Sequence, residues 1–428
     1  MFYKGTRLID SSIGKVSDDW EVVELGNVIL EAKSGFASGK RDKNGILQLR
    51  MNNIETDGRI NKDAGVKVPI PPDVDEYVLR SGDVLFNNTN SVDLIGKTAI
   101  FRGEFSRCVY SNHLTRIRVN PSKVASEWIL YSLIRKWQLG FFKTICHRHV
   151  HQAGINKNDL LKVNIPLPSL SEQQKIFEVL SVVDLAIGKV DEVIAKTERL
   201  KNGLMQELLT KGIGHKEFKE TKIGKRPKTW QVVELEKVSK DFISGGTPST
   251  KKPKFWNGNI PWIRSVHITR HFINYSSVEQ YITKEGLEYS AANIVPKDNL
   301  IVTTRVGIGK SAVNLIDVAI NQDLTGIVLD RSKVDSEFIV WYLHSPRVIQ
   351  LFESFSRGTT IKGITQSSLR NLRIPLPSLP EQQKIAKILS TVDKKVELER
   401  KEKAKLERIK RGLMDLLLTG KVRVKVAG

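Results

Sequence analysis

The stretch IPLPSLSEQQKI at residues 165–176 returns 209 positions later as IPLPSLPEQQKI at residues 374–385. The match continues without insertion or deletion to LLT at 208–210 and at 417–419. Loop segments tolerate changes of length, whereas every residue added to a helix lengthens it and rotates its end. The equal length of the two copies therefore predicts a rigid helical segment in each.

Each predicted helix begins after its proline-rich run, because a proline restricts the residue before it to non-helical conformations. Ser169 with Glu172, and Ser378 with Glu381, form the S-x-x-E pattern of a capping box. Beyond this start, apolar residues recur at alternating steps of four and three, as in the seam of a coiled coil. These spacer positions are Ile176, Leu180, Val183, Ile187, Leu204 and Leu208 in the first copy, and Ile385, Leu389, Val392, Val396, Leu413 and Leu417 in the second.

The two seams differ in the middle. The first copy has Val190 and Ile194 where the second has Glu399 and Lys403. We interpret this difference as two helices of one chain that pair with each other, with the polar middle fixing their register. The alternative is that each helix is amphipathic and lies on its own globular domain.

The composition indicates a protein that binds a polyanion. The chain of 428 residues carries a formal net charge of +21, and nucleic acid is the most common partner of so basic a protein. The other interpretation is a basic protein without such a partner. No apolar run is long enough to span a membrane, and the first residues do not form the pattern of a signal peptide. The two cysteines, Cys108 and Cys146, give no disulfide framework, so we expect the cytoplasm.

A second repeat shows that the duplication includes a globular part. IGKVSDDWEVVELGNV at 13–28 returns as IGKRPKTWQVVELEKV at 223–238. We predict two α+β globular domains at 1–165 and 216–374. Each is followed by a long helix, at 166–215 and, with the C-terminal tail, at 375–428. The connectors at 211–222 and 421–428 are polar and basic, and we expect them to be flexible at their ends.

The two globular parts differ most at 30–80 and 240–300, which predicts two recognition surfaces with different targets. Arginine can bind the edge of guanine and asparagine or glutamine the edge of adenine, whereas serine and threonine are permissive. On this basis the candidate DNA-binding residues of the first half are Lys40, Arg41, Arg50, Asn52, Asn53, Asn87, Asn88, Asn90, Lys97, His147, Arg148 and His149. Those of the second half are Arg264, Ser265, Thr303, Arg305, Lys310, Gln322, Arg357, Thr359, Thr360 and Lys362.

The sequence contains only weak motifs for nucleotide binding, metal binding or catalysis. The run IGKS at 308–311 lacks the glycine of a phosphate-binding loop, because that position holds Thr304. The run CHRHVH at 146–151 has metal-ligand types at a period of two but no partner loop, so we favour a basic loop facing DNA over ordinary packing and over a metal site. No grouping of a nucleophile with a base, and no pair of carboxylates, indicates catalysis. We therefore predict a binding protein without a metal or catalytic site.

Together these motifs closely resemble the specificity subunit of type I restriction–modification systems. The resemblance covers nearly the whole chain and includes SGGTPS at 244–249. It implies two target-recognition domains that each read one half of a bipartite, asymmetric DNA site. It also implies that the two helices form an antiparallel coiled coil with pseudo-two-fold symmetry, which sets the spacer between the half-sites.

The resemblance further implies partners that carry the chemistry. Two modification subunits would use S-adenosylmethionine to methylate adenine at N6, and restriction subunits would translocate and cut DNA with ATP and Mg²⁺. The chain itself would have no cofactor and would dock these subunits onto double-stranded DNA. The alternative that we keep is a basic coiled-coil adaptor that binds nucleic acid without sequence specificity. A steep fall of affinity with salt would count against incidental charge.

Overall fold

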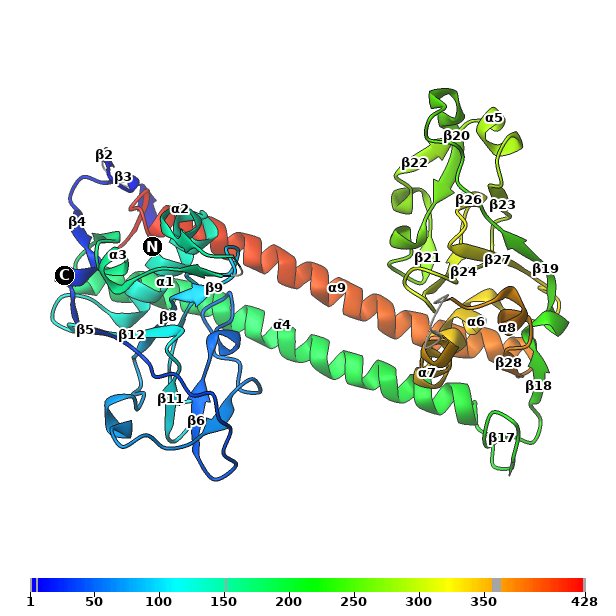
Figure 1. Cartoon of the computed structure of the whole chain (residues 1–428), viewed down its shortest axis with the longest axis horizontal. Coiled ribbons are helices and arrows are strands. Elements are labelled where there is room, and N and C mark those ends of the chain that lie inside the picture. The colour runs from blue at the N-terminus through cyan, green and yellow to red at the C-terminus, as the bar shows by residue number, and fades with distance from the viewer. Residues whose placement is uncertain (1, 5–6, 151, 356–362, 426–428) are drawn as a thin grey trace. The chain divides into compact units, whose positions relative to one another are not determined.

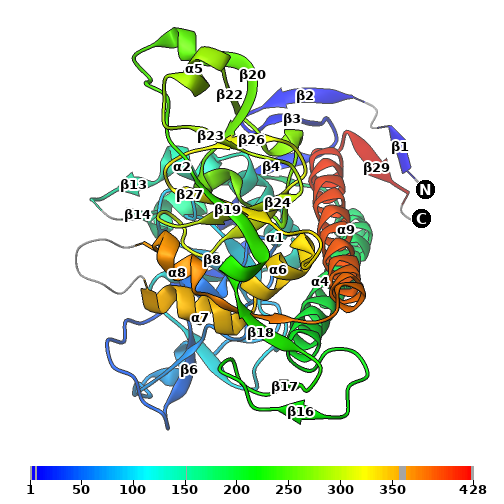
Figure 2. The same ribbon diagram turned by 90° about the vertical axis from the view of Figure 1, so that its right-hand side faces the viewer.

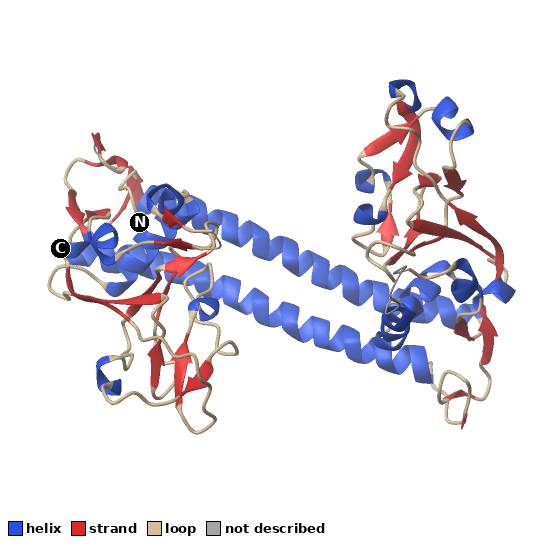
Figure 3. Cartoon of the chain, viewed as in Figure 1, coloured by secondary structure: helices blue, strands red, loops and turns tan. Residues whose placement is uncertain are grey.

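The computed structural model describes residues 2–4, 7–150, 152–355 and 363–425. The chain divides into two compact units: unit 1 is Met1–Asp191 with Lys401–Gly428, and unit 2 is Glu192–Arg400. Both combine strands with short helices and share two long uninterrupted helices, α4 (Leu170–Lys211) and α9 (Leu379–Leu417) (Figures 1 and 3). The predicted α+β fold with two similar domains and two long helices is confirmed. The compact units differ from the four predicted segments, because each takes in parts of both helices.

Unit 1 is built on two sheets. The first has the strand order β5–β12–β8–β10, and α1 (Ser126–Gln138) packs on β8 and β10. Its strands are β5 (Ile29–Ser34), β8 (Val84–Asn87), β10 (Thr98–Ile100) and β12 (Leu114–Val119). The second has the order β7–β6–β11, with β6 and β11 parallel. Its strands are β6 (Ile46–Leu49), β7 (Val66–Val68) and β11 (Cys108–Tyr110).

Unit 2 repeats both sheets. The order β19–β27–β24–β25 matches the first sheet of unit 1, and β21 adds one strand. These strands are β19 (Ser239–Ser244), β21 (Phe272–Ile273), β24 (Asn299–Thr303), β25 (Ser311–Asn314) and β27 (Leu324–Leu329). The order β22–β20–β26–β23 extends the second sheet, again with a parallel pair, β20 and β26. Its strands are β20 (Trp256–Ile263), β22 (Gln280–Ile282), β23 (Asn293–Val295) and β26 (Val318–Ile320).

Smaller elements complete the two units. In unit 2, α6 (Ser336–Leu343) packs on β24 and β25 with α7 (Pro346–Phe355) beside it (Figure 2). The other short helices are α2 (Phe141–Ile145), α3 (Lys157–Leu161), α5 (Lys284–Glu288) and α8 (Gln366–Arg370). Two equivalent hairpins pair β2 (Leu8–Ser11) with β3 (Gly14–Ser17), and β16 (Phe218–Lys219) with β17 (Arg226–Pro227).

The two long helices pair with each other inside each unit. In unit 1, Lys410 Nζ lies 2.6 Å from Asp184 Oδ1, and Lys403 Nζ lies 2.6 Å from Asp191 Oδ1. Partner numbers fall along α9 as they rise along α4, so the pairing is antiparallel. Unit 2 has the equivalent bond 209 positions away, because Lys201 Nζ lies 2.8 Å from Asp393 Oδ1.

Asp393 also contacts the globular part of unit 2. His271 Nδ1 lies 3.3 Å from Asp393 Oδ2. The hydrogen bonds from His271 and from Lys201 hold the pKa of the Asp393 carboxyl well below its usual range. This carboxylate therefore stays charged and ties α9 both to α4 and to the globular part of unit 2.

The predicted seam is on the inner side of the helices. Near the helix ends, its residues join the cores of the units. The core around Trp128 in unit 1 takes in Ile176, Leu180 and Leu417, and the core around Trp230 and Phe338 in unit 2 takes in Leu208, Ile385 and Leu389. The buried members are Ile176, Leu180, Ile187, Leu208, Ile385, Leu389, Val396 and Leu417. The partly buried members are Val183, Leu204, Val392 and Leu413.

The C-terminal connector, which we expected to be flexible at its end, forms a strand over much of its described part, and residues 426–428 lie outside the described residues. Residues Val422–Val424 form strand β29, which pairs antiparallel with β1 (Phe2–Lys4). The physical reason is Arg423, whose buried guanidinium is held by carboxylates of unit 1. Within the described ranges, no helix is long and apolar enough to cross a membrane.

Candidate nucleic-acid interface

The two repeated sequence motifs meet at one joint in each unit. The Trp20 indole donates a hydrogen bond to Glu172 Oε2 at 3.3 Å, and the equivalent Trp230 indole donates to Glu381 Oε2 at 3.1 Å. The strands beside them also pair, β4 (Glu21–Glu24) with β15 (Asn164–Leu167), and β18 (Gln231–Glu234) with β28 (Arg373–Leu376). The WxVVxL and IPLPSLxEQQKI motifs therefore attach the globular part of each unit, the candidate recognition domain, to the start of its long helix.

The glutamate at each joint also accepts from a second group. In unit 1 Arg423 donates from Nε and Nη2 to Glu172, at 2.5 and 2.8 Å. In unit 2 His215 Nε2 lies 2.9 Å from Glu381 Oε1, so the connector at 211–222 is also held in place. The predicted capping box is therefore half correct in the first copy. Ser169 Oγ accepts from the Glu172 amide at 3.4 Å, but the Glu172 carboxylate is engaged by Trp20 and Arg423.

The next glutamine gives each joint a second set of bonds. Gln173 accepts from the backbone amide of Ala125 at 2.9 Å and donates to the carbonyl of Pro168 at 2.8 Å. Gln382 makes the same bonds with Asp335 and Pro377, both at 2.9 Å. These side chains are almost completely buried, and buried amides keep a fixed orientation when both ends are bonded. Each recognition domain is therefore held rigidly on its helix.

Three loops converge at one edge of each recognition domain. In unit 1 the loop that follows β5 crosses the end of β11, where a Cβ on Gly35 would lie 2.1 Å from the carbonyl oxygen of Tyr110. In unit 2 a Cβ on Gly245 would lie 2.2 Å from the carbonyl oxygen of Ile320, at the end of β26. Only glycine fits so close to the backbone. The crossing brings each loop beside the turns that follow the parallel strands.

An arginine begins the second of these loops in both units. Arg50 follows β6 and Arg264 follows β20, and each opens a 3₁₀ turn, Met51–Asn53 and Ser265–His267. The backbone amide of Arg50 donates to Asn53 Oδ1 at 2.8 Å, and that of Arg264 donates to His267 Nδ1 at 3.0 Å. The two turns are therefore equivalent although their sequences differ.

A further predicted cluster is brought together by a small sheet in unit 1. Strands β9 (Thr89–Asn90), β14 (Ala153–Gly154) and β13 (His147–Arg148) pair in the order β13–β14–β9. The sheet places Asn90 on one outer strand and the exposed His147 and Arg148 on the other, with β14 between them, and the exposed His149 directly follows β13. His147 Nε2 lies 2.8 Å from Asp159 Oδ2, which orients the ring.

The predicted DNA-binding residues separate by exposure. The exposed or partly exposed ones are Lys40, Arg41, Arg50, Asn52, Asn90, His147, Arg148, His149, Arg264, Arg305, Lys310 and Gln322. The buried ones are Asn53, Asn87, Asn88, Lys97, Ser265 and Thr303. Arg357, Thr359, Thr360 and Lys362 lie outside the described residues.

The buried candidates serve the fold, so we leave them out of the proposed interface. Asn88 donates to Thr115 Oγ1 at 2.9 Å, and Thr303 donates to the carbonyl of Lys310 at 3.2 Å. Lys97 donates to the carbonyl of Ile54, and burial lowers the pKa of its ammonium group. These groups hold the loops that carry the exposed candidates.

Sequence reasoning missed two residues of this region. Asn112 is exposed at the turn after β11, in the position that Gln322 has after β26, and its backbone amide donates to the carbonyl of Phe36 at 3.3 Å. His267 is buried and shapes the Arg264 turn. The signal that could have found the turns is the pairing of LRMNNI at 49–54 with IRSVHI at 263–268, which needs an offset of 214.

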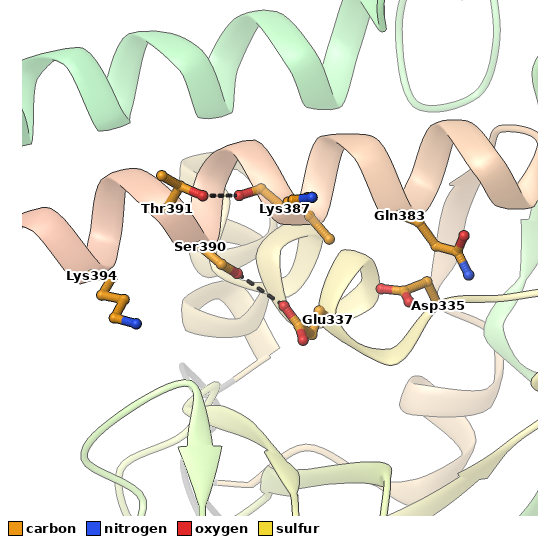
Figure 4. Close-up of a pocket in the computed structure, with 8 residues that line it drawn as sticks. Asp335, Glu337, Gln383, Lys387, Ser390, Thr391 and Lys394 are labelled. Carbon is orange, nitrogen blue, oxygen red and sulfur yellow. Dashed lines mark hydrogen bonds between the residues drawn. The ribbon is translucent and has the colours of Figure 1, made fainter.

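One shallow hollow lies away from these loops, between α6 and α9 in unit 2. It has a volume of about 290 Å³ and is lined by Asp335, Glu337, Lys387, Ser390 and Lys394 (Figure 4). Ser390 donates to Glu337 Oε2 at 3.0 Å, so these groups join helix to domain. Across the described part of the chain, no group of three or more His, Cys, Asp or Glu side chains is placed to hold a metal ion.

Comparisons with known proteins agree on one family. A family model described as the type I restriction modification DNA specificity domain matches residues 17–196 and 227–408. The putative type I restriction enzyme MjaX specificity subunit of Methanocaldococcus jannaschii is 34% identical and is matched over 99% of this chain and 98% of its own length. The MjaVIII specificity subunit of that organism is 28% identical over 99% of this chain and 98% of its length.

Solved structures share the fold. The S subunit of a type I restriction–modification system from M. genitalium has a TM-score of 0.55 at 14% identity, covering 93% of this chain and 96% of that one. A chain from a study of complex assembly in the type I R-M system has a TM-score of 0.53 at 20% identity, covering 95% and 99%. The two units described above therefore have the fold of these subunits.

Proposed function

The chain belongs to the family of type I restriction–modification DNA specificity subunits, and we propose that its two units each read one half of a split DNA site. It is a non-catalytic subunit whose function is recognition of DNA sequence, and the comparisons do not support the adaptor without sequence specificity. In this proposal α4 and α9 fix the distance between the half-sites. The pseudo-two-fold relation of the two recognition domains stays part of the proposal.

The observation that carries this proposal is the repeated joint. Trp20, Glu172 and Gln173 attach the first recognition domain to α4, and Trp230, Glu381 and Gln382 attach the second to α9 with the same bonds. A spacer helix can set a distance only if its ends do not swivel. Buried indole, carboxylate and amide bonds at both joints meet this condition.

The charge supports DNA as the ligand. A net charge of +21 favours contacts to phosphates, which give affinity and position but not sequence. Sequence discrimination must come from side chains at base edges, and the loops that differ between the units carry exposed arginine and amide groups. Two different loop sets on one frame would read two different half-sites.

The partners that we propose perform the chemistry. Two modification subunits would bind S-adenosylmethionine and methylate adenine, and restriction subunits would use ATP and Mg²⁺. The chain would dock both kinds of subunit on DNA in the cytoplasm.

The experiment is to co-express the chain with its candidate modification subunit in a host that lacks methylation, and to map N6-methyladenine across the genome. We expect one split motif with a fixed gap, because two recognition domains on rigid joints can bind only at one separation. The control is the modification subunit expressed alone.

A continuous motif would contradict the two-domain proposal. Absence of methylation with a modification subunit that is active alongside another specificity subunit would favour an adaptor role. Methylation mapping of a single culture therefore distinguishes the two-domain proposal from the adaptor role.

A further inference from the structure

We propose that Arg264 binds the major-groove edge of a guanine in the half-site read by unit 2, whereas the equivalent Arg50 has a structural role in unit 1. This inference rests on the proposed function. It goes further because it assigns a base contact to one side chain and excludes the matching side chain in the other unit. It follows from one difference in an otherwise equivalent set of bonds.

The equivalent bond joins the second loop to the first. Two residues before each arginine stands a buried side chain, Gln48 in unit 1 and Trp262 in unit 2. Gln48 Nε2 donates to the carbonyl of Phe36 at 2.9 Å, and Trp262 Nε1 donates to the carbonyl of Gly246 at 3.1 Å. Phe36 and Gly246 each follow the glycine of the crossing loop. The two side chains therefore hold the same loop by the same kind of bond.

Gln48 and Trp262 differ in whether the side chain has a hydrogen-bond acceptor. A glutamine amide has both a donor and an acceptor, whereas an indole has a donor only. Gln48 Oε1 accepts from Arg50 Nε at 3.3 Å, and Arg50 Nη2 donates onward to the carbonyl of Ser38 at 3.2 Å. The Arg50 guanidinium is thereby used to tie the loop that carries Lys40 and Arg41.

Trp262 offers no acceptor to Arg264. In unit 2 the loop is held instead by indole groups, because Trp256 Nε1 donates to the carbonyl of Ser249 at 3.2 Å. Arg264 is exposed, and within the described part of the chain its guanidinium makes no hydrogen bond or ion pair. Among the described residues, the Arg264 guanidinium therefore does not stabilise the fold as Arg50 does, and it lies at the edge where three loops meet.

The chemistry of this group selects the base. A guanidinium presents a planar fork of donors that matches the O6 and N7 acceptors of guanine, and this bidentate pair is the most common specific contact in the major groove. The 3₁₀ turn fixes the backbone of Arg264 through His267, so its reach is defined. A guanine contact at one position of one half-site is the consequence.

The test uses the full chain in complex with its modification subunit and compares Arg264→Lys with wild type. Lysine keeps the charge but cannot form the fork, so we expect discrimination at one G·C pair of one half-site to fall roughly 5- to 150-fold. The other half-site and the gap should stay unchanged. Arg331→Lys is the matched control, because Arg331 is an exposed arginine of unit 2 that contacts Asp298. The readouts are the mapped methylation motif and binding to duplexes altered at each position.

Two results would overturn the inference while leaving the proposed function intact. One is a wild-type split motif in which Arg264→Lys changes no position. The other is an Arg264→Ala variant that weakens binding to all sequences equally and lowers the salt dependence by about one phosphate, which is the behaviour of a backbone contact. Failure of the proposed function itself would look different, because the wild-type complex would then give no split motif. Thermal unfolding of each variant shows that it is folded.

Discussion

Replacing Arg423 by alanine is expected to lower the free energy of unfolding by about 3–5 kcal/mol, because it leaves a buried carboxylate without its cation. Arg423 donates to both oxygens of Glu172, and its Nη1 lies 2.7 and 2.8 Å from the oxygens of Asp19. The Glu172 side chain is only 5% exposed, so water cannot replace the lost partner. The guanidinium also lies 5.4 Å from the centre of the Trp20 ring. The substitution should therefore also destabilise strand β29 and the joint at Trp20.

Chemical denaturation followed by tryptophan fluorescence measures this effect. Arg107→Ala is the matched control in unit 1, because the Arg107–Asp75 pair is exposed and such pairs contribute about 0–1 kcal/mol. Arg423→Lys should be intermediate, since an ammonium group cannot bind two carboxylates with the same geometry. A loss for Arg423→Ala no larger than that for Arg107→Ala would show that the tail is not held by this network.

Replacing Gly35 by alanine is expected to destabilise unit 1 by about 3 kcal/mol or more and to displace the first recognition loop. The new Cβ would lie 2.1 Å from the Tyr110 oxygen and 2.5 Å from the Ser111 oxygen. Both atoms are backbone, so no side chain can move aside, and overpacking of this kind costs about 1–3 kcal/mol or more. Recognition of one half-site should weaken as a consequence, whereas the joint and the gap should be unaffected.

Gly39→Ala supplies the control for this change within the same loop. A Cβ on Gly39 meets no heavy atom within 4 Å, so this variant should differ from wild type by less than about 0.5 kcal/mol. The two measurements are the free energy of unfolding and the affinity for duplexes with either half-site altered. Equal behaviour of the two variants would contradict the crossing of the loop over β11.

Most of the fold could be predicted from the two sequence repeats. Two copies of equal length predicted the long helices, and the predicted capping residues Ser169 and Ser378 lie one residue before α4 and α9 begin. This worked because helix period and helix starts are local properties of the chain. The family resemblance, which rests on the same motifs, is confirmed by the comparisons.

The structure of the C-terminal tail and of the loops could not be predicted, because it depends on contacts between residues that are far apart in the sequence. Arg423 stands in a short basic segment, and only its meeting with Glu172, 251 positions earlier, makes it a buried group. Lys97 and Lys310 stand in nearly identical IGK motifs, yet Lys97 is buried against Ile54 and Lys310 is exposed. The neighbouring loops decide this difference. For the same reason, the base contact could be assigned to Arg264 and not to Arg50 only when the hydrogen-bond partners of both side chains were known.

The measurement that tests the central claim most directly changes the length of both helices. Seven residues, one heptad, would be inserted after Asp191 in α4 and after Arg400 in α9, where the chain passes from one unit to the other. A heptad keeps the seam in phase and adds about 10 Å. This length corresponds to about three base pairs at 3.4 Å each.

Methylation mapping of this variant with its modification subunit gives the answer. Our account predicts the same two half-sites separated by a gap about three base pairs longer, and loss of methylation when only α4 is lengthened, because unequal helices cannot keep the antiparallel pairing. An unchanged gap in the doubly lengthened variant would show that the helices do not set the spacing.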